Sequence, residues 1–100
     1  MSTTEIFPSA KAMFTAAKLA IQEDKPIVLD YWKASVEIVG ERTNALIGVR
    51  PDGQKLLVKS NGEEYTSYIK KLYQGESEYL VETENSIYVI SKQITTKRIS

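Results

Sequence analysis

The sequence predicts a single α+β domain in which one N-terminal amphipathic helix packs on a strongly bent antiparallel sheet or small β-barrel of six to seven short strands. Apolar residues recur at helical spacing only near the N-terminus, strand-like runs fill the rest of the chain, and 100 residues suffice for one modest core. The rival arrangement is a sandwich-like pair of sheets formed by dimerisation.

A helix is expected at about residues 9–23. Ser9 is a suitable N-cap, and Pro26 disfavours helical geometry at Lys25, which ends the helix. Spacings of three and four place its apolar residues on one stripe, which we expect to face the sheet. The residues of this stripe are Met13, Phe14, Ala17, Ala20 and Ile21.

Beyond Pro26, runs rich in Val, Ile, Leu, Tyr and Thr are separated by short turns. Residues 26–32 and 35–39 are expected as two short strands or one bent strand. The further expected strands are residues 45–50, 54–59, 64–73, 79–83 and 87–91, with turns at 40–44, 51–53, 60–62, 74–77 and 84–86. Residues 94–99 would add a short edge strand or hang free. Gly48, inside a strand, indicates a bulge or a close approach of another part of the backbone.

The hairpin turn at residues 51–53 has a specific chemical signature. Pro51 presets its φ angle, Asp52 can hydrogen-bond its own backbone, and Gly53 accepts a positive φ. The sequence therefore predicts antiparallel pairing of the strands on either side.

Composition narrows the classes of function. Thirteen Lys and Arg balance thirteen Asp and Glu, which argues mildly against a phosphate backbone as partner. The absence of Cys and His removes disulfides, thiolate nucleophiles, the commonest general base and nearly all structural zinc sites. No carboxylate pair or glycine-rich loop indicates a catalytic or cofactor site, so we expect a protein that is not an enzyme, with no metal and no cofactor.

The N-terminal residues 1–6 lack a basic region followed by an apolar core, and no apolar run is long enough to span a bilayer. We therefore expect an intracellular, soluble protein without a membrane partner.

Trp32 is the first candidate binding residue. In a strand it would share one face with Asp30 while Tyr31 points to the other, and an aromatic residue in that position is more often a structural anchor than a binding site. Exposure of Trp32 would favour binding.

The second candidate is the segment 65–73, which interleaves aromatic and basic residues as a platform for single-stranded nucleic acid does. Its candidate contacts are Tyr65, Tyr68, Lys70, Lys71 and Tyr73. Strand alternation divides them between two faces, however, and cross-strand pairing of tyrosines with exposed lysines is the simpler interpretation. Lys97 and Arg98 could join Lys92, Lys70 and Lys71 in one basic patch, or could blunt an exposed edge.

Residues 25–32, 47–60 and 78–91, which contain the strings KPIVLDYW, IGVRPDGQKLLVKS and EYLVETENSIYVIS, resemble short uncharacterised proteins encoded by large DNA viruses of amoebae. The resemblance covers most of the chain after the helix. It implies a non-enzymatic accessory protein of the virion or the infected host cell.

Two functions therefore remain open. The first is a non-catalytic binding or assembly module that self-associates as a dimer, through the helix flank or an edge strand, or contacts another protein. The second is a small nucleic-acid-binding domain that uses the tyrosine–lysine segment, with Lys97 and Arg98 as contacts to the phosphate backbone.

Overall fold

The computed structural model describes residues 7–59, 62 and 64–99 and confirms an α+β fold. Within these residues there are two helices and ten strands. The elements are α1 (Ala10–Glu23), β1 (Ile27–Val28), α2 (Trp32–Val36), β2 (Ile38–Val39), β3 (Arg42–Thr43), β4 (Ala45–Val49), β5 (Lys55–Lys59), β6 (Tyr65–Tyr68), β7 (Lys71–Gln74), β8 (Glu78–Glu82), β9 (Ile87–Ser91) and β10 (Thr95–Arg98).

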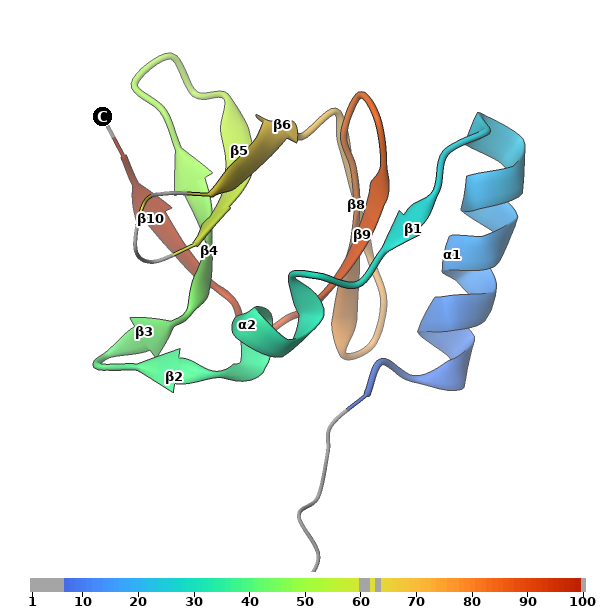
Figure 1. Cartoon of the computed structure of the whole chain (residues 1–100), viewed down its shortest axis with the longest axis horizontal. Coiled ribbons are helices and arrows are strands. Elements are labelled where there is room, and N and C mark those ends of the chain that lie inside the picture. The colour runs from blue at the N-terminus through green and yellow to red at the C-terminus, as the bar shows by residue number, and fades with distance from the viewer. Residues whose placement is uncertain (1–6, 60–61, 63, 100) are drawn as a thin grey trace, which may run out of the picture.

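The elements form three layers, which Figure 1 shows from α1 through one sheet to the other. Sheet I has the strand order β1-β9-β8-β7 and sheet II the order β10-β4-β5-β6, while β2 and β3 form a separate hairpin. The strand count exceeds the predicted six to seven because several strands are only two residues long. Among the described residues the sheets do not close into a barrel, so the barrel alternative is not realised.

Two strand pairings differ from the antiparallel prediction. β1 runs parallel to β9 and β10 runs parallel to β4, so both sheets are mixed. Of the two alternatives for the C-terminal residues, a short edge strand or a free tail, the structure has the edge strand. Ile99 lies beside Gly48, where a Cβ atom would come 2.7 Å from the Ile99 Cδ1. Gly48 therefore makes room for a side chain, not for the bulge or the close backbone approach that the sequence indicated.

The hairpin between β4 and β5 confirms the turn predicted at residues 51–53. Gly53 has a φ of 89°, and the Gln54 amide donates to the Asp52 carboxylate at 3.0 Å. This hydrogen bond lowers the pKa of Asp52. The turn predicted at 60–62 lies outside the described residues except for Gly62, whose φ is 75°.

The region 26–39 was predicted wrongly in part. Only Ile27–Val28 and Ile38–Val39 are strands, and Trp32–Val36 between them forms the short helix α2. Tyr31 and Trp32 are consequently not alternating strand residues. Trp32 packs with Ala16 on the α1 side of sheet I, whereas Tyr31 lies in the core between the sheets. Because α2 contacts both β9 of sheet I and β4 of sheet II, consecutive side chains at its start can pack into both layers.

The position of α1 was predicted closely, but its orientation about its own axis was not. Ser9 caps the helix, with its Oγ accepting from the Ala12 amide at 3.1 Å. The buried residues are Ala12, Ala16 and Leu19, whereas two members of the predicted stripe, Phe14 and Ile21, are 67% and 83% exposed. The small side chains of Ala12 and Ala16 let the helix approach the sheet closely, and polar contacts at both helix ends fix its rotation.

Two hydrophobic clusters hold the layers together. The cluster between the sheets contains Tyr31, Ala34, Ala45, Ile47, Leu57, Val81, Ile90 and Ile94. The cluster between α1 and sheet I contains Ala16, Trp32, Leu80 and Val89, with Tyr73 packed against it. Sheet I is thus covered on both faces. No helix in the described part of the chain has the length and apolar character needed to cross a membrane.

Candidate functional site: an open strand edge and its grooves

The segment predicted as one strand at 64–73 forms two strands in two different sheets. β6 is the terminal strand of sheet II and β7 the terminal strand of sheet I. Between them the chain crosses from sheet to sheet, with the Ile69 amide bonded to the Lys55 carbonyl and the Lys70 amide to the Glu82 carbonyl, each at 2.7 Å. Among the residues that the structure describes, residues 65–74 therefore form one continuous margin with no further strand beside it, which we call the open edge.

The ladder of β7 shows which backbone groups are available at this edge. β7 pairs with β8 in antiparallel register, and the Gly75 amide donates to the Glu78 carbonyl at 2.8 Å. Hydrogen-bonded and non-hydrogen-bonded pairs alternate from that point, so Tyr73 bonds toward Leu80. The amide and carbonyl groups of Leu72 and Gln74 consequently point away from β8.

Three of the exposed large apolar side chains lie on the open edge. Tyr65 is 63%, Tyr68 39% and Leu72 36% exposed, and Lys70 and Lys71 are exposed between them. A strand edge that carries apolar side chains and unpaired backbone groups is a template for pairing with another strand.

A groove of about 440 Å³ runs between α1 and the β7–β8 hairpin, and we call it the helix groove. Lys11, Ala12 and Thr15 come from the helix, while Tyr73 and Leu80 come from the strands. Residues 74–78, from Gln74 to Glu78, form its end. Tyr73 lies on the face of β7 that the helix covers, because it packs against the cluster of Ala16 and Leu80.

The N-terminal end of α1 is bound to β8 beside this groove. Glu78 is only 4% exposed, and its carboxylate accepts from the Ser9 amide at 2.7 Å and from the Ser9 hydroxyl at 3.3 Å. A buried carboxylate requires such donors, since desolvation without hydrogen bonds is costly. Glu78 is therefore an anchor for the helix as well as part of the groove.

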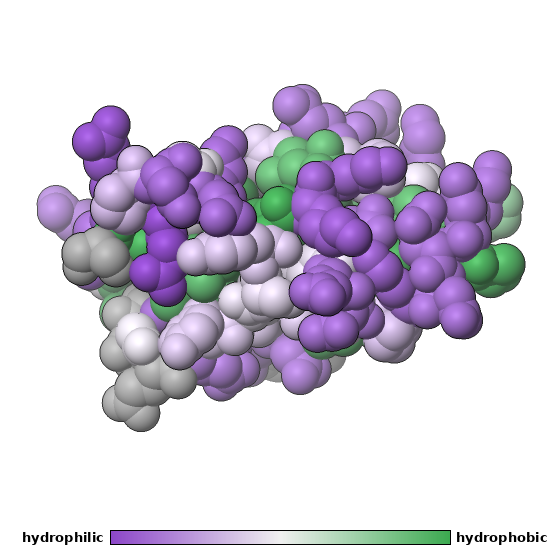
Figure 2. Space-filling model, turned by 90° about the horizontal axis from the view of Figure 1, so that it is seen from above, coloured by the Kyte–Doolittle hydropathy of each residue, from purple (hydrophilic) through white to green (hydrophobic). Residues whose placement is uncertain are grey.

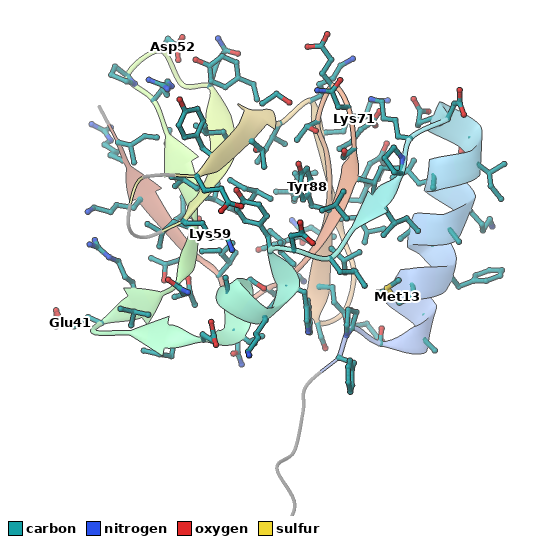
Figure 3. All side chains as sticks on the ribbon, viewed as in Figure 1. Met13, Glu41, Asp52, Lys59, Lys71 and Tyr88 are labelled. Carbon is teal, nitrogen blue, oxygen red and sulfur yellow. The ribbon has the colours of Figure 1, made fainter. Side chains whose placement is uncertain are left out.

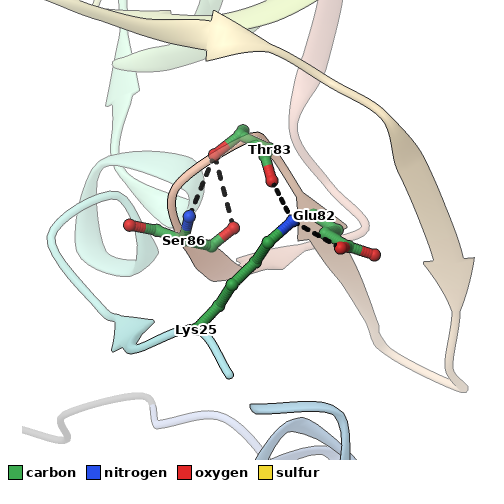
Figure 4. Close-up of polar contacts among 4 residues, drawn as sticks. All are labelled: Lys25, Glu82, Thr83 and Ser86. Atoms are coloured by element: carbon green, nitrogen blue, oxygen red, sulfur yellow. Dashed lines mark hydrogen bonds and ion pairs between the residues drawn. The ribbon is translucent and has the colours of Figure 1, made fainter. Parts of the chain in front are cut away.

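The other end of α1 is held by an ion pair, which Figure 4 shows. The Lys25 ammonium lies 2.6 Å from the Glu82 Oε2 and donates to the Thr83 carbonyl at 2.8 Å. The hydrogen bond that Lys25 donates to the Glu82 carboxylate, together with the positive charge of Lys25, lowers the pKa of Glu82, although burial acts in the opposite direction. The second carboxylate oxygen, Oε1, is buried without a hydrogen-bond partner among the described residues.

A second groove, of about 580 Å³, lies beside β6, and we call it the β6 groove. Tyr65, Tyr68 and Lys70 line it together with Arg50 and Glu84. The Arg50 guanidinium lies 5.9 Å from the centre of the Tyr68 ring, within the range of a cation–π contact. Its buried Nε has no hydrogen-bond partner among the described residues.

Trp32 lines a third groove, of about 480 Å³, together with Phe7, Val36 and Lys92. Ser9 and Glu78 also belong to it, so this groove and the helix groove meet at the N-terminal end of α1. Trp32 itself is only 8% exposed, which agrees with its interpretation as a structural anchor.

A cluster of tyrosines occupies the region between the sheets, where Figure 3 places Tyr88 and Lys59. The Tyr31 and Tyr88 rings meet edge to face at 5.5 Å, and the Lys59 ammonium lies 4.8 Å from the centre of the Tyr31 ring. Burial, reinforced by the negative charge of Glu64, raises the pKa of Tyr31 to about 12. Burial also raises the pKa of Tyr88. Both phenols remain protonated at neutral pH, which suits packing rather than proton transfer.

The structure brings together some of the residues singled out in the sequence and separates others. Tyr65, Tyr68 and Lys70 share the β6 groove, whereas Tyr73 lies in the helix groove. Lys97 and Arg98 lie on β10, at the opposite margin of sheet II from β6. The expected union of the C-terminal basic residues with Lys70 and Lys71 is therefore not supported.

Sequence reasoning missed three residues of these sites: Arg50, Leu72 and Glu78. Arg50 precedes a turn, Leu72 has an ordinary strand pattern, and Glu78 stands among many carboxylates. Only the pairing of distant strands gives them their positions.

Polar side chains dominate the face seen in Figure 2, with small apolar patches between them. The described residues contain no group of three or more carboxylates placed to hold a metal ion. Comparisons with protein-family models, curated proteins and solved structures find no match for this chain.

Proposed function

We propose that this chain is a non-catalytic assembly module that self-associates through the open edge. The observation that supports this proposal is the union of two terminal strands, β6 and β7, into one margin that carries Tyr65, Tyr68 and Leu72 at the surface. Strand addition to such an edge supplies main-chain hydrogen bonds for affinity and side-chain contacts for specificity. The expected partner is a second copy, or another protein that offers an extended segment.

The other strand margins are less suited to pairing. β1 has only two residues, and β10 carries the exposed side chains of Lys97 and Arg98, which discourage edge-to-edge contacts. β6 has a register shift opposite Leu56 and Val58. β7 keeps a regular register over all four of its residues.

Light scattering coupled to size exclusion, at two protein concentrations, tests the proposal. We expect a mass above that of the monomer that rises with concentration. Leu72→Pro should raise the dissociation constant by about tenfold or more, because proline removes an amide that points to the open edge and leaves the β7–β8 ladder intact. A constant monomer mass at both concentrations would contradict self-association.

Thr96→Pro is the matched control on a different edge. The Ile99 amide bonds to the Val49 carbonyl, so in the parallel ladder of β10 the amide of Thr96 points away from β4. Proline at Thr96 therefore disturbs an open edge without breaking the sheet. We expect the self-association of this variant to match that of the parent chain.

Nucleic-acid binding is the second candidate function, and the β6 groove is the observation that favours it. Tyr65 and Tyr68 offer ring faces for base stacking, and Arg50 and Lys70 offer positive charge in the same groove, although Glu84 opposes them. The scattering experiment repeated with mixed-sequence single-stranded and double-stranded DNA tests it. A shift that weakens steeply with salt and disappears in Tyr68→Ala would favour this function over assembly.

A further inference from the structure

The charges at the open edge indicate how a second copy would pair with it. Lys70 stands before β7 and Glu76 stands after it, and both are exposed. Neither forms an ion pair among the described residues. Lys70 and Glu76 are equally distant in sequence from Tyr73, so an antiparallel copy centred on Tyr73 places each beside the opposite charge of its partner.

The backbone supports the same register. Leu72 and Gln74, one residue on either side of Tyr73, are the residues whose amide and carbonyl groups point outward. When Tyr73 faces its own copy, Leu72 of each chain faces Gln74 of the other, and these two pairs exchange four main-chain hydrogen bonds.

Other twofold registers lose the charge pairing. An axis through Leu72 sets Glu76 against Tyr68, and an axis through Gln74 sets it against Leu72. Only the axis through Tyr73 gives two Lys70–Glu76 contacts together with outward-pointing backbone partners. Lys70 and Glu76 lie in the bends just beyond the two ends of β7, so these contacts flank the ladder, where opposite charges favour a pairing and like charges oppose it.

We infer that two copies join β7 to β7 in antiparallel register, with the twofold axis through Tyr73, so that the two four-stranded sheets I become one continuous sheet. This inference rests on the proposed function and names its partner and register. The interface is isologous, because each copy contributes the same strand. Tyr73 meets its counterpart on the α1 face of the sheet, beside the helix groove, where an aromatic cross-strand pair adds stability.

Cysteine cross-linking tests the register directly, because the chain has no cysteine of its own. Tyr73 would occupy a non-hydrogen-bonded pair, in which the Cβ atoms lie about 4.5–5.5 Å apart, close to the range for a disulfide. We expect Tyr73→Cys to form a covalent dimer under mild oxidation. Leu72→Cys is the matched control, because residue 72 would face Gln74 of the other copy rather than its own counterpart.

Charge exchange gives a second test that does not depend on oxidation. Lys70→Glu sets like charges against each other at two places and should raise the dimer dissociation constant by about tenfold. Glu76→Lys should have a similar effect. The double variant Lys70→Glu with Glu76→Lys restores both contacts and should return the constant to within about threefold of the parent value.

The outcomes separate this inference from the function on which it rests. A monomer at all concentrations overturns both. A dimer without Tyr73→Cys cross-linking and without rescue in the double variant overturns the register and leaves assembly standing. A dimer that persists in Leu72→Pro but is lost in Phe14→Ser would overturn the register by placing the interface on the exposed side of α1.

Discussion

The two ends of α1 are held on the same strand by the same kind of side chain, yet in different chemical ways. Glu82 holds the C-terminal end through an ion pair with Lys25. Glu78, four residues earlier on the same face of β8, holds the N-terminal end through the amide and hydroxyl of Ser9. Both carboxylates are almost completely buried, at 2% and 4% exposure.

The difference shows how a helix can be fixed firmly and still leave an open groove beside it. Of the three grooves described above, two meet at Ser9 and Glu78, and none includes Glu82. The C-terminal end, where Lys25 compensates the charge of Glu82, contributes to stability. The N-terminal end, where the neutral groups of Ser9 bind Glu78, also borders the helix groove that Tyr73 lines. Four substitution or pH experiments distinguish these roles.

The largest effect is expected at the ion pair. Lys25→Met leaves the buried Glu82 carboxylate without its cation, which should lower the free energy of unfolding by about 3 kcal/mol. Urea denaturation measures this loss. Lys33→Met is the control, because Lys33 and Glu37 are exposed and 3.9 Å apart, and its loss should stay within about 0.5 kcal/mol. Equal losses in the two variants would contradict a special role for the buried pair.

A smaller loss is expected at the other end of the helix. Glu78→Gln keeps an oxygen that can accept from the Ser9 amide, so it should cost about 1 kcal/mol. Ser9→Ala removes the hydroxyl that caps α1 and should cost a similar amount. If Glu78→Gln destabilised the protein as much as Lys25→Met, the proposed contrast between the two ends would be wrong.

The third experiment follows the Glu82 contribution with pH. Its pKa is lowered in the folded protein, so its stabilising effect is fully present above the unfolded pKa of about 4.3 and is lost as the pH falls through the lower folded pKa. The difference in unfolding free energy between the parent and Glu82→Gln should therefore shrink when the pH falls below about 4. A difference that stays constant from pH 7 to pH 3 would exclude this linkage.

The smallest effect is spectroscopic. Trp32 is the single tryptophan and lies in the groove that includes Glu78. Glu78→Gln should therefore shift the emission maximum of the native protein by a few nanometres, on the order of the effect of a changed polar neighbour. Glu82→Gln should leave it unchanged, because Glu82 lies at the other end of the helix. A shift in Glu82→Gln and none in Glu78→Gln would show that the surroundings of Trp32 in the third groove do not depend on Glu78.

Local signals explain which parts of the fold could be predicted. Ser9 and Pro26 bounded the helix, and Pro51-Asp52-Gly53 located a hairpin, because capping, proline geometry and positive φ act within a few residues. The rotation of α1 could not be predicted in this way. Its apolar residues lie on more than one side, and contacts with Glu78 and Glu82, more than fifty residues away, decide which side is buried.

The candidate site likewise has features that the local sequence predicts and features that depend on distant contacts. The tyrosine–lysine segment was identifiable from its composition. Strand alternation, however, grouped Tyr65 with Tyr73 and set Tyr68 apart, whereas the structure places Tyr65 with Tyr68 in the β6 groove. The crossing at Ile69 and Lys70, which moves Tyr73 away from Tyr68 and into the helix groove, depends on separate pairings with β5 and β8.

Residue types and short spacings are enough to predict the α+β class, the helix with its cap, the positions of most strands and the absence of thiol and imidazole chemistry. Tertiary structure decided the parallel pairing of β1 and β10, the short helix at Trp32, the exposed side of α1 and the union of β6 and β7 into one open edge. Each of these depends on contacts between segments far apart in the chain, and their free energy outweighs the weak preferences of the local sequence.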